Sequence, residues 1–317
     1  MDPQHRLLID LATARRAVFH HVGILVRSSA VPEVFTTSLG IMLRIADTRT
    51  GRIVEIPSAH RHLLRICVHL PVIDTGIGAV HLRAPLTGDV LARTVELHGL
   101  QSLTVLTVPD LPHEQAQALD RAMALLGIHP PATVGVHDVT EALCTAADVH
   151  LLAHGAPGRD AVGGVWIDVG QVSPAPPDGG VPDRGHLLAS GLLDAFAPAG
   201  TDPLAVRMLL LGHDLRTPVT VTSTALAEAR RMLRHWREQV ADWAQEPSRP
   251  IPADVLRQAH AALADDLGVP AVLEMLDGMA TRADVPAGAK FETFAFLDRV
   301  LGLDLARQVG HQPWATP

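Results

Sequence analysis

The stretch LLRICVHLPVIDTGIGAVHLRAPLTGDVLARTVELHG, residues 63–99, decides the fold of this chain. Its first eight residues, 63–70, form an apolar run of strand length, which is typical of a strand buried in a parallel sheet. A glycine-rich turn follows. A helical pattern then begins near Pro85 and stops at Gly99, residue types that suit the first position and the end of a helix. Strand, glycine turn and helix in this order predict a nucleotide-binding type of sheet.

Strand and helix patterns alternate through the first half of the chain. Further strands are expected at residues 43–56, where Thr50-Gly51 turn the chain back on itself, at 101–108 and at 165–172, and further helices at 112–126 and 137–152. This order predicts an α/β fold, with a Rossmann-like parallel sheet and right-handed crossovers over residues 41–172.

The second half of the chain predicts a helical bundle. Residues 173–200 begin with SPAPPDGGVPDRG, whose prolines and glycines suit neither a helix interior nor a central strand, so we expect a linker there. Residues 201–317 follow as an all-α domain. Its apolar stripe from Leu226 to Trp243, at steps of three and four, is expected to face other helices. Residues 1–40 are expected to form an amphipathic helical extension.

The composition favours a globular protein and argues against nucleic acid and membrane as partners. The 317 residues are 47% hydrophobic and carry a net charge of −8, and Lys290 is the one lysine among the basic residues. Binding a nucleic-acid backbone needs a concentrated basic face, which scattered arginines on an acidic chain do not provide. The sequence has no signal peptide and no apolar stretch of membrane-spanning length, so we expect a cytoplasmic protein with reduced cysteines.

Four parts of the chain, in this order, resemble cysteinyl-tRNA synthetase and its relative, the cysteine ligase of mycothiol synthesis. These parts are LRIADTRTGRIVEI at 43–56, the stretch 63–99, LPHEQAQALDRAMALLGIHPPATVGVHDVTEAL at 111–143, and the helical segments 202–229 and 262–276. The resemblance implies a class I synthetase fold joined to a helical bundle, with ATP as the ligand of the glycine turn. It assigns nucleotide binding to Gly76, Gly78 and His81.

The signature motifs of that family are incomplete in this chain. The family's His-Ile-Gly-His turn corresponds to Gly78-Ala79-Val80-His81, so one of its two phosphate-contacting imidazoles is kept. The family's lysine loop, which neutralises the pentavalent phosphate, has no lysine here, and Arg184 is the cation nearest to its expected place. Charge stabilisation of this kind is commonly worth several kcal/mol. We therefore assign no catalytic residue.

The zinc site of the family is also incomplete. The resemblance places its first ligand, a cysteine, at His69, which would lie in the amino-acid-binding site, and the other three ligands in a stretch that this chain lacks. Cys67 and His69 lie two residues apart on a strand and share one face, but two ligands are too few for zinc. We therefore expect no metal. Other histidines close in sequence are interpreted as surface or core residues, namely His60 with His62, and His150 with His154 at helical spacing.

The chain favours a small acceptor over tRNA. In the family, the tRNA synthetases continue past the bundle into an anticodon-reading region, whereas this chain and the mycothiol ligase do not. Together with the acidic charge, this favours a small-molecule amine or a protein as the partner. Residues 1–40 lie outside the resemblance and could cover the sheet edge, fill the place of the missing stretch, or form a dimer.

Two functions remain open at this point. The first is a degenerate homologue that keeps the fold but has lost adenylation, and acts as a binding or regulatory protein. The second is a divergent ligase in which His81 contacts phosphate, the following helix N-terminus favours negative charge, and Arg83 or Arg184 replaces the lysines. A dinucleotide fingerprint that starts at Gly76 lacks its third glycine.

Overall fold

The computed structural model describes residues 43–56, 63–73, 76–134, 143, 146–157, 163–174 and 202–310, which belong to one structural unit, Gly40–Pro317. The expected extension over residues 1–40 and nearly all of the expected linker 173–200 lie outside the described residues. So do His60, His62, Cys144 and Arg184.

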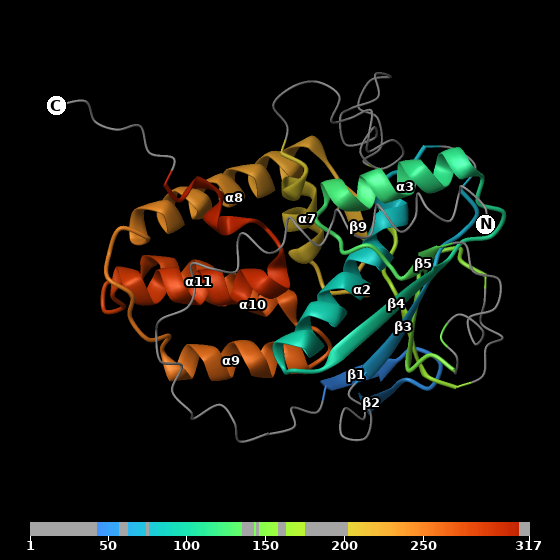
Figure 1. The fold of residues 1–317 in the computed structure, drawn as a ribbon, viewed down its shortest axis with the longest axis horizontal. Helices are drawn as coiled ribbons and strands as arrows, with labels where there is room; N and C mark the ends of the chain where they lie inside the picture. Colours follow the sequence, from blue (N-terminus) through green and yellow to red (C-terminus); the bar gives the residue numbers. More distant parts are fainter. Residues whose placement is uncertain are drawn as a thin grey trace, which may run out of the picture. The chain divides into compact units, whose positions relative to one another are not determined.

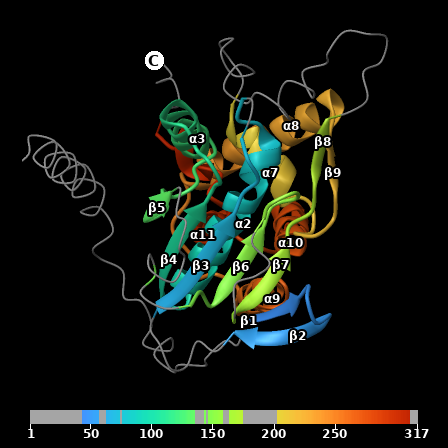
Figure 2. The ribbon, with the colours of Figure 1, turned by 90° about the vertical axis from the view of Figure 1, so that its right-hand side faces the viewer.

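The centre of the fold is a five-stranded parallel sheet in the order β5-β4-β3-β6-β7 (Figure 2). Its strands are β3 (Leu63–His69), β4 (Gln101–Thr107), β5 (Thr133–Val134), β6 (Val149–Leu152) and β7 (Val165–Asp168). The strand order reverses between β3 and β6, because β4 and β5 extend the sheet on one side of β3 and β6 and β7 on the other. Ligands of open parallel sheets bind outside the carboxyl ends of the strands at such a reversal.

Two helices connect the first strands of the sheet, as the sequence predicts. Helix α2 (Ala79–Leu97) follows β3, and α3 (His113–Leu125) follows β4. A Cβ atom at Gly88 would lie 3.1 Å from the Val68 side chain, so glycine allows α2 to approach the sheet closely. The expected helix end is also confirmed, because Gly99 takes a positive φ of 80° just after the last turn.

Helix α2 begins six residues earlier than the sequence predicts. It starts at Ala79, directly after an extended Gly78, and Pro85 lies inside the helix rather than at its first position. Ala79, Leu82 and Leu86 are buried at steps of three and four. The apolar face of this first turn therefore packs into the core, and this packing outweighs the hydrogen bond lost at the proline.

The predicted helix over residues 137–152 is wrong at its described end. Val149–Leu152 is strand β6, fully buried between β3 and β7. A four-residue apolar run fits a buried strand and a buried helix segment equally well by its pattern, and here the pairing on both sides favours the strand. His150 therefore lies on the sheet, and its helical spacing from His154 has no structural meaning.

The first strand pair agrees with the expectation, whereas the strands that end the first half of the chain differ from it. The hairpin of β1 (Leu43–Asp47) and β2 (Arg52–Ile56) is confirmed. The expected strand 165–172 is two strands, because β7 ends at Asp168 and β8 (Val172–Pro174) pairs with β9 (Val219–Val221). The helical part of the chain thus contributes one short strand beside its helices.

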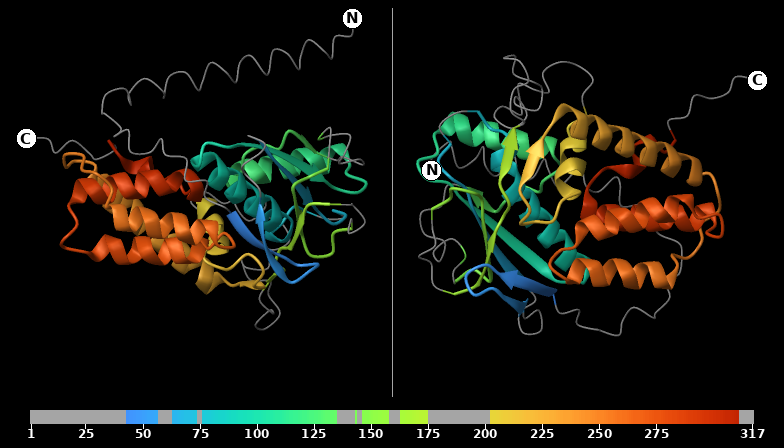
Figure 3. Two further views of the ribbon diagram at one scale, coloured as in Figure 1. Left: turned by 90° about the horizontal axis from the view of Figure 1, so that it is seen from below. Right: turned by 180° about the vertical axis from the view of Figure 1, so that it is seen from behind.

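The rest of that part is helical, as expected. Its elements are α7 (Leu204–Leu211), α8 (Ser223–Trp243), α9 (Ala253–Ala264), α10 (Val269–Thr281), α11 (Ala287–Leu301) and the 3₁₀ helix η2 (Leu305–Gln308). Helices α8 to α11 lie alongside one another (Figure 3), and α11 packs against α2, whose other side packs against β3 and β4 (Figure 1). The predicted fold class, a Rossmann-like sheet followed by a helical bundle, is confirmed. Among the described residues, no helix combines the length and apolarity needed to cross a membrane.

Candidate functional site

A small cavity lies at the reversal of strand order, beside the first turns of α2. Its volume is about 100 Å³. Pro71, Ala153 and Val169 line it from just beyond the carboxyl ends of β3, β6 and β7, and Val80 and Arg83 line it from α2. This is the place at which a doubly wound sheet binds its ligand, and the turn that the sequence predicts to bind nucleotide begins α2 beside it.

The predicted nucleotide-binding residues come together at this turn but do not line the cavity. Gly78 precedes the first residue of α2, and its backbone N–H donates to Nδ1 of His81 at 3.2 Å. Gly76 is exposed two residues earlier. The first turn of α2 contains no acidic residue, so the positive end of the helix dipole is not opposed within the turn.

His81 is a neutral hydrogen-bond donor in this setting. Burial lowers the pKa of its imidazole, so the ring is uncharged at neutral pH. Because Nδ1 accepts the Gly78 N–H, the single proton of the neutral ring is on Nε2. His81 can therefore donate one hydrogen bond to an anion, but it brings no positive charge.

The guanidinium of Arg83 is occupied by the protein itself. Its Nη1 donates to the carbonyl oxygens of Gly170 at 2.8 Å and Thr217 at 2.6 Å, with Gln171 at 3.4 Å, and its Nη2 donates to that of Asp214 at 2.8 Å. Burial lowers the pKa of Arg83 to about 10, which leaves the group protonated at neutral pH. Arg83 thus joins α2 to two loops through its own donors, which argues against the prediction that it replaces the missing lysines.

The one lysine of the chain is also occupied. Lys290 lies buried in α11, where its ammonium donates to the carbonyl oxygen of Ala280 at 2.8 Å and sits 5.4 Å from the centre of the Trp243 ring. Lys290 therefore stabilises the bundle and is not a mobile cation for a phosphate.

His69 lies in a buried cluster on one face of the sheet rather than at the cavity. Cys67 and His150 are paired neighbours on β3 and β6, and Trp166 is the next partner along the row, on β7. His69 Nε2 lies 3.0 Å from His150 Nδ1, and His69 Nδ1 lies 2.9 Å from the hydroxyl of Thr107. The rings of His150 and Trp166 stack with their centres 4.2 Å apart. The sequence missed His150 here, because it placed that residue on a helix.

Burial keeps every ionisable group of this cluster neutral. It lowers the pKa of His69 to about 4 and raises that of the Cys67 thiol to about 12. Burial, with smaller effects of the neighbouring His69 and Arg49, lowers the pKa of His150 to about 4. The cluster thus offers two uncharged imidazoles and one thiol at neutral pH.

We expect the protein to lose stability as the pH falls from about 6.5 to about 4 because of this cluster. In the unfolded chain both imidazoles titrate near 6.5, whereas in the fold the pKa values are about 4. The unfolded state binds more protons throughout this window, so stability falls with pH, by up to about 3 kcal/mol for each imidazole. Urea unfolding of the metal-free protein at several pH values measures this loss. An equally steep loss in the double variant His69→Gln/His150→Gln would contradict the assignment.

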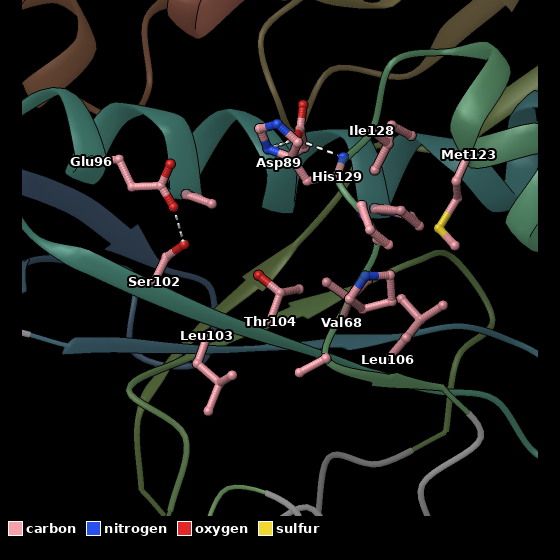
Figure 4. Close-up of a pocket in the computed structure, with 15 residues that line it drawn as sticks. Val68, Asp89, Glu96, Ser102, Leu103, Thr104, Leu106, Met123, Ile128 and His129 are labelled. Atoms are coloured by element: carbon pink, nitrogen blue, oxygen red, sulfur yellow. Dashed lines mark hydrogen bonds and ion pairs between the residues drawn. The ribbon is translucent and has the colours of Figure 1, made fainter. Parts of the chain in front are cut away.

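A larger cavity lies on the other side of α2, between that helix, β4 and the segment after α3 (Figure 4). Its volume is about 350 Å³. Three of its acidic and hydroxyl side chains are engaged, because the Ser102 hydroxyl donates to Glu96 at 2.6 Å and Asp89 accepts from the backbone N–H of His129 at 3.0 Å. None of the residues that the sequence assigns to nucleotide or amino-acid binding lines this cavity.

Asp89, at the back of this cavity, is the centre of an ion-pair network that the sequence did not reveal. It accepts hydrogen bonds from Arg93 at 2.8 Å and from the fully buried Arg207 of α7 at 2.7 Å. Arg207 also donates to the carbonyl oxygen of Leu126 at 3.0 Å, at the end of α3. The network joins the sheet-covering helices to the bundle and is structural.

Comparison with known proteins relates part of this sequence to one group of enzymes. No family model matches the chain. Several curated proteins do, and each is named L-cysteine:1D-myo-inositol 2-amino-2-deoxy-alpha-D-glucopyranoside ligase. The ligase of Catenulispora acidiphila is 37% identical over 108 residues, which are 33% of this chain and 23% of the relative. Over about a third of its length, the chain is homologous to these ligases.

Two further relatives give the same result. The ligase of Xylanimonas cellulosilytica is 37% identical over 123 residues, 38% of this chain and 28% of the relative. That of Thermobifida fusca is 33% identical over 128 residues, 39% of this chain and 29% of the relative. The chain thus matches about a quarter of the length of these relatives. The resemblance predicted from the sequence is confirmed for the cysteine ligase family.

Proposed function

We propose that this chain is a binding or regulatory homologue of the cysteine ligases that does not form an adenylate. In the family reaction, the amino-acid carboxylate attacks the α-phosphate of ATP and pyrophosphate leaves. The departing oxygens carry growing negative charge, and removing one group that stabilises such charge commonly costs about 3 kcal/mol. Formation of the adenylate therefore depends on cations close to the turn.

The occupied side chain of Arg83 is the observation that supports this proposal most strongly. It is the one arginine or lysine among the described residues that line the cavity at the turn, and its donors go to backbone carbonyls. Lys290 is bound within the bundle, and His81 contributes a neutral donor. Among the described residues that line this cavity, none thus offers a free guanidinium or ammonium to neutralise pyrophosphate.

Nucleotide titration tests this proposal. If the turn binds an α-phosphate without cations for the others, AMP and ATP should bind with dissociation constants that agree within about threefold. The variant His81→Ala should weaken both nucleotides equally. Isothermal titration calorimetry measures these constants. An ATP affinity more than tenfold above that of AMP, and dependent on His81, would show that a cation for the outer phosphates is present.

A divergent ligase is the second candidate. The N-terminus of α2 and the Nε2–H of His81 favour it, because both remain suited to an anionic ligand. Such an enzyme would activate cysteine with ATP and pass it to a small-molecule amine, with Arg184 as the remaining candidate cation.

A regulatory role needs a protein partner, and an active cysteine ligase encoded by the same genome is the partner we propose. Adding this chain to that ligase should change its kcat/KM for cysteine or for the amine. An unchanged kcat/KM at saturating amounts of this chain would contradict the regulatory role. Binding of a small ligand would then be the proposed function.

A further inference from the structure

The cluster on the sheet brings together three groups that ligate metals. One potential ligand atom from each of Cys67, His69 and His150 lies within 4.8 Å of the other two. The three residues are 0%, 4% and 1% exposed. Cys67 and His69 come from β3 and His150 from β6, so the sheet pairing fixes their positions.

The hydrogen bonds within this cluster leave one atom without a partner. The Nε2 atom of His150 is buried and has no hydrogen-bond partner. If His69 Nε2–H donates to His150 Nδ1, the proton of His150 is on Nε2, where it has no acceptor. If His150 Nδ1–H donates instead, Nε2 carries a lone pair that has no donor. Either tautomer leaves a buried polar atom unsatisfied, which native structures rarely tolerate without an ion or a water.

The separations between the potential ligand atoms are compatible with those around a bound zinc ion. Around a tetrahedral zinc ion, two imidazole nitrogens lie about 3.3 Å apart and a thiolate sulfur lies about 3.6 Å from each nitrogen. His69 Nε2 and His150 Nδ1 are 3.0 Å apart through their hydrogen bond, which shows how closely the two rings approach. One ligand atom from each of the three residues lies within 4.8 Å of the other two.

The ligand set implied by the family resemblance differs from this one. That set places a cysteine where this chain has His69 and takes its other ligands from a stretch that this chain is expected to lack. Cys67, two residues before His69 on β3, and His150, on β6, are not part of that set.

We propose that Cys67, His69 and His150 bind one zinc-type divalent cation, which joins β3 to β6. One thiolate and two imidazoles select zinc over magnesium or calcium, which prefer oxygen ligands. On binding, the thiol of Cys67 loses its proton to solvent and both imidazoles bind through a lone pair, so one proton is released for each cation. Three protein ligands leave one coordination position open. Because the site is buried, the cation enters as the sheet forms.

Metal analysis and refolding test this proposal independently of any nucleotide function. The full chain purified without chelator should contain about one zinc per molecule. Protein unfolded with a chelator and refolded with Co²⁺ should show a thiolate-to-cobalt charge-transfer band at one equivalent, with release of about one proton per cation. Refolded protein with native circular dichroism but no bound cation would overturn the proposal.

Cys67 and Cys144 provide a matched pair of variants. Cys67→Ser should abolish the charge-transfer band, and Cys144→Ser should leave it unchanged. His150→Gln should weaken cobalt binding at least tenfold, whereas His98→Gln, at a half-buried histidine outside the cluster, should not. If Cys67→Ser fails to fold without metal, the wild-type chain and Cys144→Ser still identify the thiolate ligand. A cobalt band in both proteins assigns it to Cys67, the one cysteine that remains in Cys144→Ser. A band that survives Cys67→Ser but is lost in Cys144→Ser would contradict the assignment.

Discussion

Replacing Asp89 by asparagine is expected to destabilise the fold by about 3–5 kcal/mol, because it leaves a buried guanidinium without a counter-charge. Burial alone would raise the pKa of Asp89. The hydrogen bond from His129 and the charges of Arg207 and Arg93 outweigh burial and hold the pKa well below its ordinary range. The carboxylate is therefore charged at neutral pH, and Arg207, which is fully buried, depends on it.

Urea unfolding at neutral pH measures this effect. The control is Asp284→Asn, at an exposed carboxylate paired with Arg282, for which we expect no measurable change. The double variant Asp89→Asn/Arg207→Met should recover part of the loss, because it removes the stranded charge together with its partner. A loss below 1 kcal/mol for Asp89→Asn would mean that solvent or another group compensates Arg207.

Replacing Arg83 by lysine is expected to cost about 3 kcal/mol of folding stability although it conserves the charge. A guanidinium reaches the carbonyl oxygens of Gly170, Asp214 and Thr217 with separate donors, whereas a single ammonium cannot reach all of them. These hydrogen bonds are partly buried, and each carbonyl oxygen left without a donor costs about 1 kcal/mol.

Arg83→Lys also tests whether Arg83 contributes a cation to a phosphate site. If Arg83 only joins α2 to its neighbouring loops, the variant should unfold at lower urea concentration and, once folded, bind ATP as before. Arg121→Lys, at an exposed arginine of α3, is the control for stability and should have no effect. Unchanged stability together with weaker nucleotide binding would return Arg83 to the phosphate site.

The sheet and its first helix could be predicted because their signals are local. The apolar run at 63–70 and the helical pattern that follows describe β3 and α2 without reference to the rest of the chain. The start of α2 was misplaced because Pro85 was interpreted as a first helical residue. The buried series Ala79, Leu82 and Leu86 contains the information that locates it.

The chemistry of the site could not be predicted from local pattern. The partners of Arg83 lie 87 to 134 residues away, at Gly170 and Thr217, in loops that only the folded chain brings together. His150 meets Cys67 through the pairing of β6 with β3, and β6 is too short to be distinguished from a helix by periodicity. The sequence therefore indicated which groups are missing from the turn, and the structure shows which of the remaining groups are already engaged.

Amino-acid-dependent exchange of radiolabelled pyrophosphate into ATP tests the central claim most directly, because it detects adenylate formation without an acceptor. With cysteine, and with each other amino acid, we predict no label in ATP above the level without protein. An active cysteine ligase under the same conditions is the positive control. Label that returns to ATP with this chain, and that is lost in His81→Ala, would contradict the account and identify the protein as a working ligase.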